Sequence, residues 1–339
     1  MKTVCFGEVM LRLNPEGYYR IRQTSRFDAS YAGGEANVAV SLANYGIHSC
    51  FVSKFPDNEI GQSAADALRR YGVDVSGVIR GGDRLGIYFV EKGASQRPSK
   101  VIYDRKYSAV AESRPEEYNW DKIFEDCDWF HFTGITPALS DSLAETCLQA
   151  CREAKKRDIT ISCDLNYRKK LWTREKAGEV MGKLMPYVDV CIANEEDAND
   201  VFGIKAPNTD VGSGVLNKEG YRYVAKELHD RFGCKTVAIT LRTSISASDN
   251  KWAGMLYQDG QDYYSKEYLI HLVDRVGGGD SFGGGLIYAL QKGYSMQDTI
   301  EYAVAASCLK QTIEQDYNLV SVAEVEALMH GNGTGRVQR

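Results

Sequence analysis

The middle of the chain alternates short runs that are apolar nearly throughout with longer stretches that carry apolar residues on one side only. The apolar runs predict β-strands over residues 128–134, 159–166, 187–194 and 236–242. The stretches between them predict helices that begin near Ser140, Thr173 and Glu195 or span residues 220–232. Strands apolar on both faces and separated by helices indicate an α/β protein, with a mostly parallel sheet covered by helices on both sides.

Two regions break this rhythm. Residues 10–30, and the pair 86–93 with 99–109, alternate apolar and polar positions with no helix between them, which predicts a small, exposed antiparallel sheet. Residues 203–220 are rich in Gly, Asn and Pro and are predicted to form a surface loop. The predicted organisation is an α/β domain over 1–9, 31–84 and 110–325, a small β-sheet over 10–30 and 85–109, and a flexible tail over 326–339.

Composition narrows the function to chemistry on small molecules. The net charge is -5, with 41 basic and 46 acidic residues intermixed, so no basic surface for nucleic acid or an anionic membrane is indicated. No apolar run has the length of a signal peptide core or a membrane span. The nine cysteines form no C-x-x-C pair, which favours free thiols in a reducing cytoplasm. Cys147 and Cys151 lie one helical turn apart, but with no histidine near them in sequence we interpret them as buried small residues rather than metal ligands.

The stretch "VDRVGGGDSFGGGLIYAL" (273–290) places three glycines and an aspartate directly before a predicted helix. A Walker loop would require a lysine after its last glycine, and this chain has none there. A dinucleotide-binding turn counted from Gly277 would place Phe282 where its last glycine belongs. Neither of these two glycine fingerprints is therefore present.

The glycines nevertheless suit an anion site. Backbone N–H groups can converge without Cβ atoms between them, and the helix N-terminus adds about half a positive charge. Asp280 stands inside this cradle, where it would repel a bound phosphate. The presence of Asp280 in the cradle is explained if its carboxylate accepts the proton of a hydroxyl that attacks the phosphate. The alternative is that Asp280 only caps the helix.

Two motifs together resemble those of the ribokinase-like (PfkB) sugar kinases. "DRVGGGDSF" resembles the C-terminal signature D-T-x-G-A-G-D-x-F, and "YAGGEANVAVSLANYG" (31–46) resembles the N-terminal signature G-G-x-x-x-N-x-A. They lie about 240 residues apart, in the expected order, and the resemblance covers residues 1–325. It implies a three-layer α/β/α fold with a small β-sheet that closes over the sugar as a lid. It also implies ATP and Mg²⁺ as cofactors, with a monovalent cation as a further candidate, and we expect a homo-oligomer.

Within this family the chain is most similar to 2-keto-3-deoxygluconate kinases, through "YDRKYSA" (103–109), "FTGITPAL" (132–139) and "DLNYRKKLW" (164–172) as well as the two signatures. The resemblance implies that Asp280 is the base and that Gly277, Gly278 and Gly279 form the anion hole. It implies a sugar site lined by Gly34, Asn37, Tyr88, Tyr103, Arg105, Ile135 and Arg168. It places Asn166, Asn194, Thr240 and Arg242 toward the nucleotide, and Glu196 and Asp197 near Mg²⁺ through water.

The chain departs from the family pattern at two places. The family motif N-x-x-E appears as "NEED" (194–197), with Asp197 where Glu is usual and Glu195 and Glu196 as alternatives. The strand on the nucleotide side usually ends in a turn that contains glycine, whereas this chain has none between Arg242 and Gly254.

A sugar acid needs a cation in its site, and a guanidinium can form two parallel hydrogen bonds with a carboxylate. Arg105 and Arg168 are the candidates, and the alternative is that each is a solvated surface residue. We predict transfer of the γ-phosphate of MgATP to the terminal primary hydroxyl of 2-keto-3-deoxygluconate. Another sugar kinase, such as a fructokinase, is the alternative. A non-catalytic sugar-binding protein would not need Asp280, and a dehydrogenase is disfavoured by the glycine spacing.

Overall fold

A computed structural model of the chain describes residues 1–206 and 218–331. Ten of the strands in these ranges form one sheet, with the order β13-β12-β11-β10-β9-β8-β1-β4-β5 and with β14 paired to β12. The pairs from β5 to β11 are parallel, while β12 pairs in antiparallel fashion with β11, β13 and β14. The predicted α/β architecture with a mostly parallel sheet is confirmed, and the antiparallel extension at the β11 edge was not predicted.

The large sheet is built from β1 Lys2–Phe6, β4 His48–Phe55, β5 Val78–Arg80, β8 Trp129–Thr133, β9 Thr160–Asp164, β10 Val190–Ala193, β11 Thr236–Ser244, β12 Asp249–Gln258, β13 Gln261–Tyr264 and β14 Tyr268–His271. The helices are α1 Gly34–Asn44, α2 Glu59–Arg70, α3 Trp120–Ile123, α4 Ile135–Ala138, α5 Asp141–Lys155, α6 Arg174–Leu184, α7 Glu195–Phe202, α8 Lys218–Phe232, α9 Gly278–Gln291, α10 Met296–Lys310 and α11 Val322–Met329. Two short 3₁₀ turns cover Pro115–Glu117 and Met185–Tyr187.

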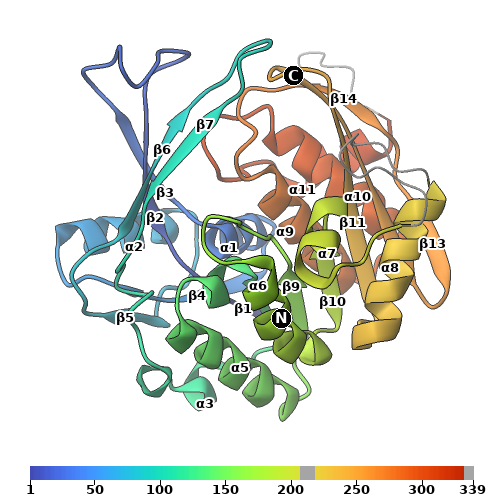
Figure 1. Cartoon of the computed structure of the whole chain (residues 1–339), viewed down its shortest axis with the longest axis horizontal. Coiled ribbons are helices and arrows are strands. Elements are labelled where there is room, and N and C mark those ends of the chain that lie inside the picture. The colour runs from blue at the N-terminus through green and yellow to red at the C-terminus, as the bar shows by residue number, and fades with distance from the viewer. Residues whose placement is uncertain (207–217, 332–339) are drawn as a thin grey trace.

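Helices cover both faces of the large sheet, because its central strands are apolar on both sides. In β10, Val190 and Ile192 join the core that contains α1, α9 and α10, whereas Cys191 and Ala193 join the core that contains α5, α6 and α8. Alternating side chains of one strand therefore contribute to two separate cores. The result is the predicted three-layer arrangement, seen in Figure 1.

Hydroxyl and amide side chains set where the predicted helices begin. Ser140 accepts a hydrogen bond from the amide of Leu143 at 3.1 Å and caps α5. Thr173 caps α6 in the same way. Such caps satisfy amides that have no partner within the helix, which explains why these starts were predictable from sequence.

The small sheet has the order β3-β2-β6-β7, from Asp28–Ala32, Met10–Asn14, Gly86–Glu91 and Lys100–Asp104. Figure 1 shows its strands in blue and cyan extending beyond the α/β body. The sheet is mixed rather than antiparallel as predicted, because its central pair, β2 and β6, is parallel. The two strands come from hairpins that lie far apart in the sequence, so no turn constrains their relative direction.

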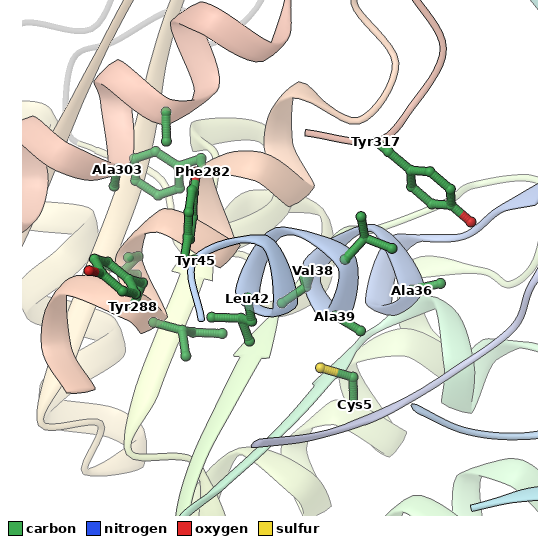
Figure 2. Close-up of a cluster of buried hydrophobic side chains, with 14 of the residues drawn as sticks. Cys5, Ala36, Val38, Ala39, Leu42, Tyr45, Phe282, Tyr288, Ala303 and Tyr317 are labelled. Atoms are coloured by element: carbon green, nitrogen blue, oxygen red, sulfur yellow. The ribbon is translucent and has the colours of Figure 1, made fainter. Parts of the chain in front are cut away.

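Helices α1, α9 and α10 pack closely beneath the site, as Figure 2 shows for Val38, Leu42 and Tyr45 beside Phe282 and Tyr288. The second glycine run of the "GGGDSFGGG" stretch serves this packing. A Cβ on Gly284 would lie 2.7 Å from Cβ of Ser41 on α1, and one on Gly285 would lie 3.0 Å from Cβ of Ala306 on α10. The absence of Cβ atoms at Gly284 and Gly285 therefore lets α9 pack closely against α1 and α10.

The C-terminal boundary differs from the prediction. Helix α11 continues to Met329, so part of the tail expected from residue 326 is helical. Residues 332–339 of that tail, and 207–217 of the predicted loop, lie outside the described residues. None of the helices within 1–206 and 218–331 is long and apolar enough to cross a membrane.

Candidate active site

A cavity of about 560 Å³ lies at the carboxyl ends of the parallel strands. In parallel α/β sheets this is the edge at which ligands bind. All residues assigned to the site from sequence line this cavity: Gly34, Asn37, Tyr88, Tyr103, Arg105, Ile135, Asn166, Arg168, Asn194, Glu196, Asp197, Thr240, Arg242, Gly277, Gly278, Gly279 and Asp280. The structure thus brings both signatures and the small sheet to one place, while the individual roles of these residues stay predictions.

The glycine turn has the geometry of an anion cradle. Gly277 is the N-cap of α9 with φ +82°, and a Cβ there would overlap the carbonyl oxygen of Asp316. The positive φ and the lack of space for a Cβ atom therefore both exclude residues other than glycine at position 277. Within the described part of the chain, the amides of Gly279 and Asp280 donate to no protein acceptor. Two free amides at a helix N-terminus form a ready site for an anion.

Asp280 points toward α1 and does not cap its own helix. Its Oδ2 accepts a hydrogen bond from Nδ2 of Asn37 at 2.6 Å, and its Oδ1 would lie 3.6 Å from a Cβ on Gly34. The N-cap of α9 is Gly277, with no side-chain cap bond. The capping alternative is therefore wrong. Burial raises the pKa of Asp280 from 3.8 to about 6, although the bond from Asn37 lowers it.

Two further carboxyl groups share this region. Asp164 ends β9, and burial raises its pKa, with further upward contributions from Asp197 and Asp280. Burial also raises the pKa of Asp197 to about 6. Asp197 accepts bonds from the amides of Tyr167 at 3.0 Å and Asn194 at 3.4 Å. Because like charges at a site raise each other's pKa, these groups would become more acidic if a cation bound between them.

Whether these residues suit Mg²⁺ can be judged from their chemistry. In the part of the chain that is described, no three Asp, Glu, His or Cys side chains are arranged to hold a metal ion. Mg²⁺ commonly keeps several waters and needs only one or two carboxylates beside the phosphates. Glu196 is exposed at the cavity, and the oxygens of Asp197 retain further lone pairs. The residues therefore fit a magnesium ion held through water.

The two candidate arginines differ in their surroundings. Arg105 is buried and pairs with Glu8, which also accepts a bond from Ser108 at 2.5 Å. Part of its guanidinium is thus already satisfied, and it lies over the ring of Tyr103 at 5.4 Å. Arg168 is exposed to the cavity, and its one hydrogen bond within residues 1–206 and 218–331 goes to the carbonyl of Tyr167, at 2.9 Å. Arg168 is the better placed of the two to receive a carboxylate.

A buried ionic network connects the small sheet to the glycine turn. Arg12 of β2 is fully buried and pairs with Asp274 at 2.5 Å and with Asp316 at 2.6 Å. The hydroxyl of Tyr88 on β6 donates to the other oxygen of Asp316 at 2.9 Å. Behind the turn, Nζ of Lys310 donates to the backbone carbonyls of Asp274 and Val276. Removing one member of such a network leaves a buried charge without its partner.

The strand that carries Thr240 and Arg242 continues past the position at which the family has a turn that contains glycine. Strand β11 continues to Ser244 and pairs along its whole length with β12, so the chain reverses after Arg242 rather than at it. Ser246 closes this reversal by accepting bonds from the amides of Ser248 and Asp249, both at 3.0 Å. Thr240 and Arg242 therefore lie on a regular strand that faces the cavity.

Sequence reasoning missed several residues that line the cavity: Glu8, Glu35, Asp164, Arg275 and Asp316. Asp164 could have been found, because it is a carboxylate at the end of an apolar strand within a stretch already identified. Glu35 lies inside the N-terminal signature, where Thr133 and Thr136 donate to its Oε1, and burial raises its pKa to about 7. No sequence signal marked Glu8 or Asp316, which reach the site only through the fold.

Comparison with known proteins agrees with this geometry. The model of the pfkB family of carbohydrate kinases matches residues 1–319. A 2-dehydro-3-deoxygalactonokinase of Haloferax volcanii is 34% identical, with 98% of each chain covered. A solved 2-dehydro-3-deoxygluconokinase of Thermotoga maritima is 50% identical, with a TM-score of 0.94 and 98% of each chain covered. A fructokinase of Xylella fastidiosa solved with ATP shares the fold, with 20% identity, a TM-score of 0.77 and 98% of each chain covered. The chain therefore belongs to the pfkB family of carbohydrate kinases.

Proposed function

We propose that this kinase transfers the γ-phosphate of ATP to the terminal primary hydroxyl of 2-keto-3-deoxygluconate, which gives 2-keto-3-deoxy-6-phosphogluconate and ADP. The observation that carries the proposal is the position of Asp280 beside two amides, those of Gly279 and Asp280 itself, that have no acceptor among the described residues. A base and an oxyanion site are thus adjacent. The names of the relatives from Haloferax volcanii and Thermotoga maritima support a 2-keto-3-deoxy sugar acid as the acceptor.

The chemistry follows from the contacts of Asp280. Asn37 holds Oδ2 at 2.6 Å and leaves Oδ1 to accept a proton. As the sugar hydroxyl oxygen forms its bond to the γ-phosphorus, its proton passes to Asp280, and the bond from phosphorus to the bridging oxygen breaks to release ADP. The free amides of Gly279 and Asp280 stabilise the charge on the transferring group.

Magnesium, when bound, neutralises charge on the phosphates and orients them. Glu196 and Asp197 would hold it through water, and Asn166, Asn194 and Thr240, which line the same cavity, would contact the nucleotide. Asn166 adopts φ +41°, a conformation that asparagine tolerates better than most residues, and this turn directs the chain from β9 toward Arg168.

The carboxylate of the substrate sets its specificity. Arg168 forms no ion pair within the described residues, although its charge lowers the pKa of Asp164, Asp197 and Asp280. Arg105 retains Nη1 beyond its contacts with Glu8. A neutral sugar would leave Arg168 without the pair of hydrogen bonds that a carboxylate supplies. The small sheet, which contributes Tyr88, Tyr103 and Arg105, would act as the lid over the sugar.

The test is an ADP-release assay on 2-keto-3-deoxygluconate, 2-keto-3-deoxygalactonate, fructose and ribose. We expect kcat/KM for the gluconate derivative to exceed that for either neutral sugar by roughly 10²-fold or more, since an unpaired charge at the site costs a few kcal/mol. A higher kcat/KM with fructose would refute the substrate assignment and favour the fructokinase alternative. The rate with the galactonate derivative shows which configuration at one carbon the enzyme prefers. Either preference is compatible with a 2-keto-3-deoxy sugar acid as the substrate.

A further inference from the structure

Arg275 lies at the mouth of the glycine turn and was not assigned a role from sequence. It is two residues before Gly277, within "DRVGGGD", at the position where the signature of the family has threonine. Its side chain is half-buried and lines the cavity. The chain thus places a permanent positive charge where the family pattern has a neutral hydroxyl.

This charge has no counter-ion in the described part of the chain. No carboxylate pairs with Arg275, and its guanidinium donates no hydrogen bond to protein there. The adjacent carboxylate, Asp274, forms its ion pair with Arg12. A half-buried guanidinium at the cavity wall with no acceptor among the described residues is available to an anion that enters the cavity.

A second arginine lies close to it. Burial lowers the pKa of Arg275, and the positive charge of Arg242 lowers it further. Arg242 projects from β11 into the same cavity, and it too has no acidic partner among the described residues. Two guanidiniums that face one space repel each other unless an anion lies between them.

The chemistry of the site selects the anion. A sugar carboxylate carries one negative charge and has Arg168, on the loop after β9, as its own receptor. The polyphosphate of a nucleotide carries several negative charges, and a planar guanidinium can donate two hydrogen bonds to the oxygens of one phosphate group. Arg242 shares its strand with Thr240 on the nucleotide side, and Arg275 lies three residues before the start of α9, whose amides receive the transferring phosphate.

We propose that Arg275 and Arg242 form a guanidinium pair that binds the terminal phosphates of the nucleotide beside the glycine turn. This inference rests on the proposed kinase function. It predicts that the pair distinguishes nucleotides by phosphate number: ATP and ADP gain from it, whereas AMP does not.

The test is equilibrium binding of ATP, ADP and AMP with Mg²⁺ and without sugar, by calorimetry, to the wild type and to Arg275→Thr and Arg275→Lys. Loss of charge-assisted hydrogen bonds should weaken ATP binding by roughly 10- to 100-fold in Arg275→Thr and leave AMP binding unchanged. The lysine variant keeps the charge without the planar geometry, so its affinity should fall between the two. KM for the sugar acid should change by less than about twofold, because Arg168 receives the carboxylate.

Two controls keep the outcome interpretable. Arg242→Thr changes an exposed side chain, so folding is not at risk, and it should weaken ATP binding in the same direction. Arg157→Thr removes a half-buried arginine outside the cavity, paired with Asp121 and Glu153, and should leave nucleotide binding unchanged. Unchanged ATP affinity in both cavity variants, or a rise in KM for the sugar acid alone, would overturn the inference. Because binding is measured without sugar, a wrong sugar assignment would leave this result intact.

Discussion

Replacing Asp280 with asparagine should abolish most catalysis and at the same time stabilise the fold. The amide is nearly the same shape as the carboxylate, and its Oδ1 can still accept the bond from Asn37 that the carboxylate accepts at 2.6 Å. What changes is the charge. Without a base, kcat should fall by roughly 10²- to 10⁴-fold. With no charge at position 280, the folded state is relieved of the free energy that burial of the Asp280 carboxylate costs.

The size of the stabilisation follows from the pKa of Asp280. Burial raises it from 3.8 to about 6, and a change of one in pKa corresponds to about 1.4 kcal/mol. The folded protein holds this proton more tightly than the unfolded chain, so the group favours folding most in acid and progressively less as pH rises to about 6. At pH 7.5 the charge costs on the order of 3 kcal/mol, which is an upper bound because the side chain is only partly buried.

This free energy is measurable as a shift in melting temperature. An unfolding entropy of about 2.1 cal/mol/K per residue gives on the order of 0.7 kcal/mol/K for a chain of this length, so Tm should rise by about 4 °C at pH 7.5. At pH 5 the wild type is mostly protonated at Asp280 when folded, and the gain should shrink to about half. Asp83→Asn, at an exposed residue outside the cavity, should shift Tm at neither pH. A Tm for Asp280→Asn that is lower than that of the wild type, or a shift independent of pH, would refute the reasoning.

Two further substitutions test the sugar side and the turn. Arg168→Ala should raise KM for the sugar acid by roughly 10-fold or more and spare KM for ATP, since the lost hydrogen bonds are charge-assisted; equal loss for both substrates, measured by steady-state kinetics, would make its role structural. Gly277→Ala should lower both kcat and the free energy of unfolding, because it adds a clash with Asp316 to the cost of φ +82°. Gly293→Ala carries a similar φ of +72° with open space around it and should cost only about 1 to 2 kcal/mol in urea denaturation.

The body of the fold could be predicted because its local signals agree with its packing. Ser140 and Thr173 cap the helices they were expected to start, and the strands between them are apolar on both faces. The parallel pairing of β2 with β6 could not be predicted, because it joins two hairpins through contacts that leave no local pattern. The continuation of β11 into the hairpin with β12 was missed for a related reason: its reversal uses the side chain of Ser246 instead of glycine.

For the site, too, residues within local motifs could be predicted, and residues that reach it only through the fold could not. Residues within the motifs, such as Asn37 and Asp280, are neighbours in the structure and hydrogen-bonded to each other, although 243 positions separate them. Groups that act on the motifs from elsewhere could not be found in one sequence. Glu8 forms an ion pair with Arg105, and Asp316 accepts hydrogen bonds from both Arg12 and Tyr88. Their significance depends on where the small sheet meets the turn, which only the fold determines.

The charges of the cavity explain how a carboxylate can work inside an anion cradle. Asp164, Asp197 and Asp280 lie together, and each has a raised pKa. Each of these carboxylates therefore binds a proton more readily than a carboxylate in water does. An incoming triphosphate alone would raise the pKa of Asp280 further and disable the base. The arginines oppose this effect: Arg168 lowers the pKa of all three carboxyl groups, and Arg242 and Arg275 would neutralise the phosphates themselves. The base can then remain ionised when both substrates are bound, because the cations that hold them also offset the charge that they bring.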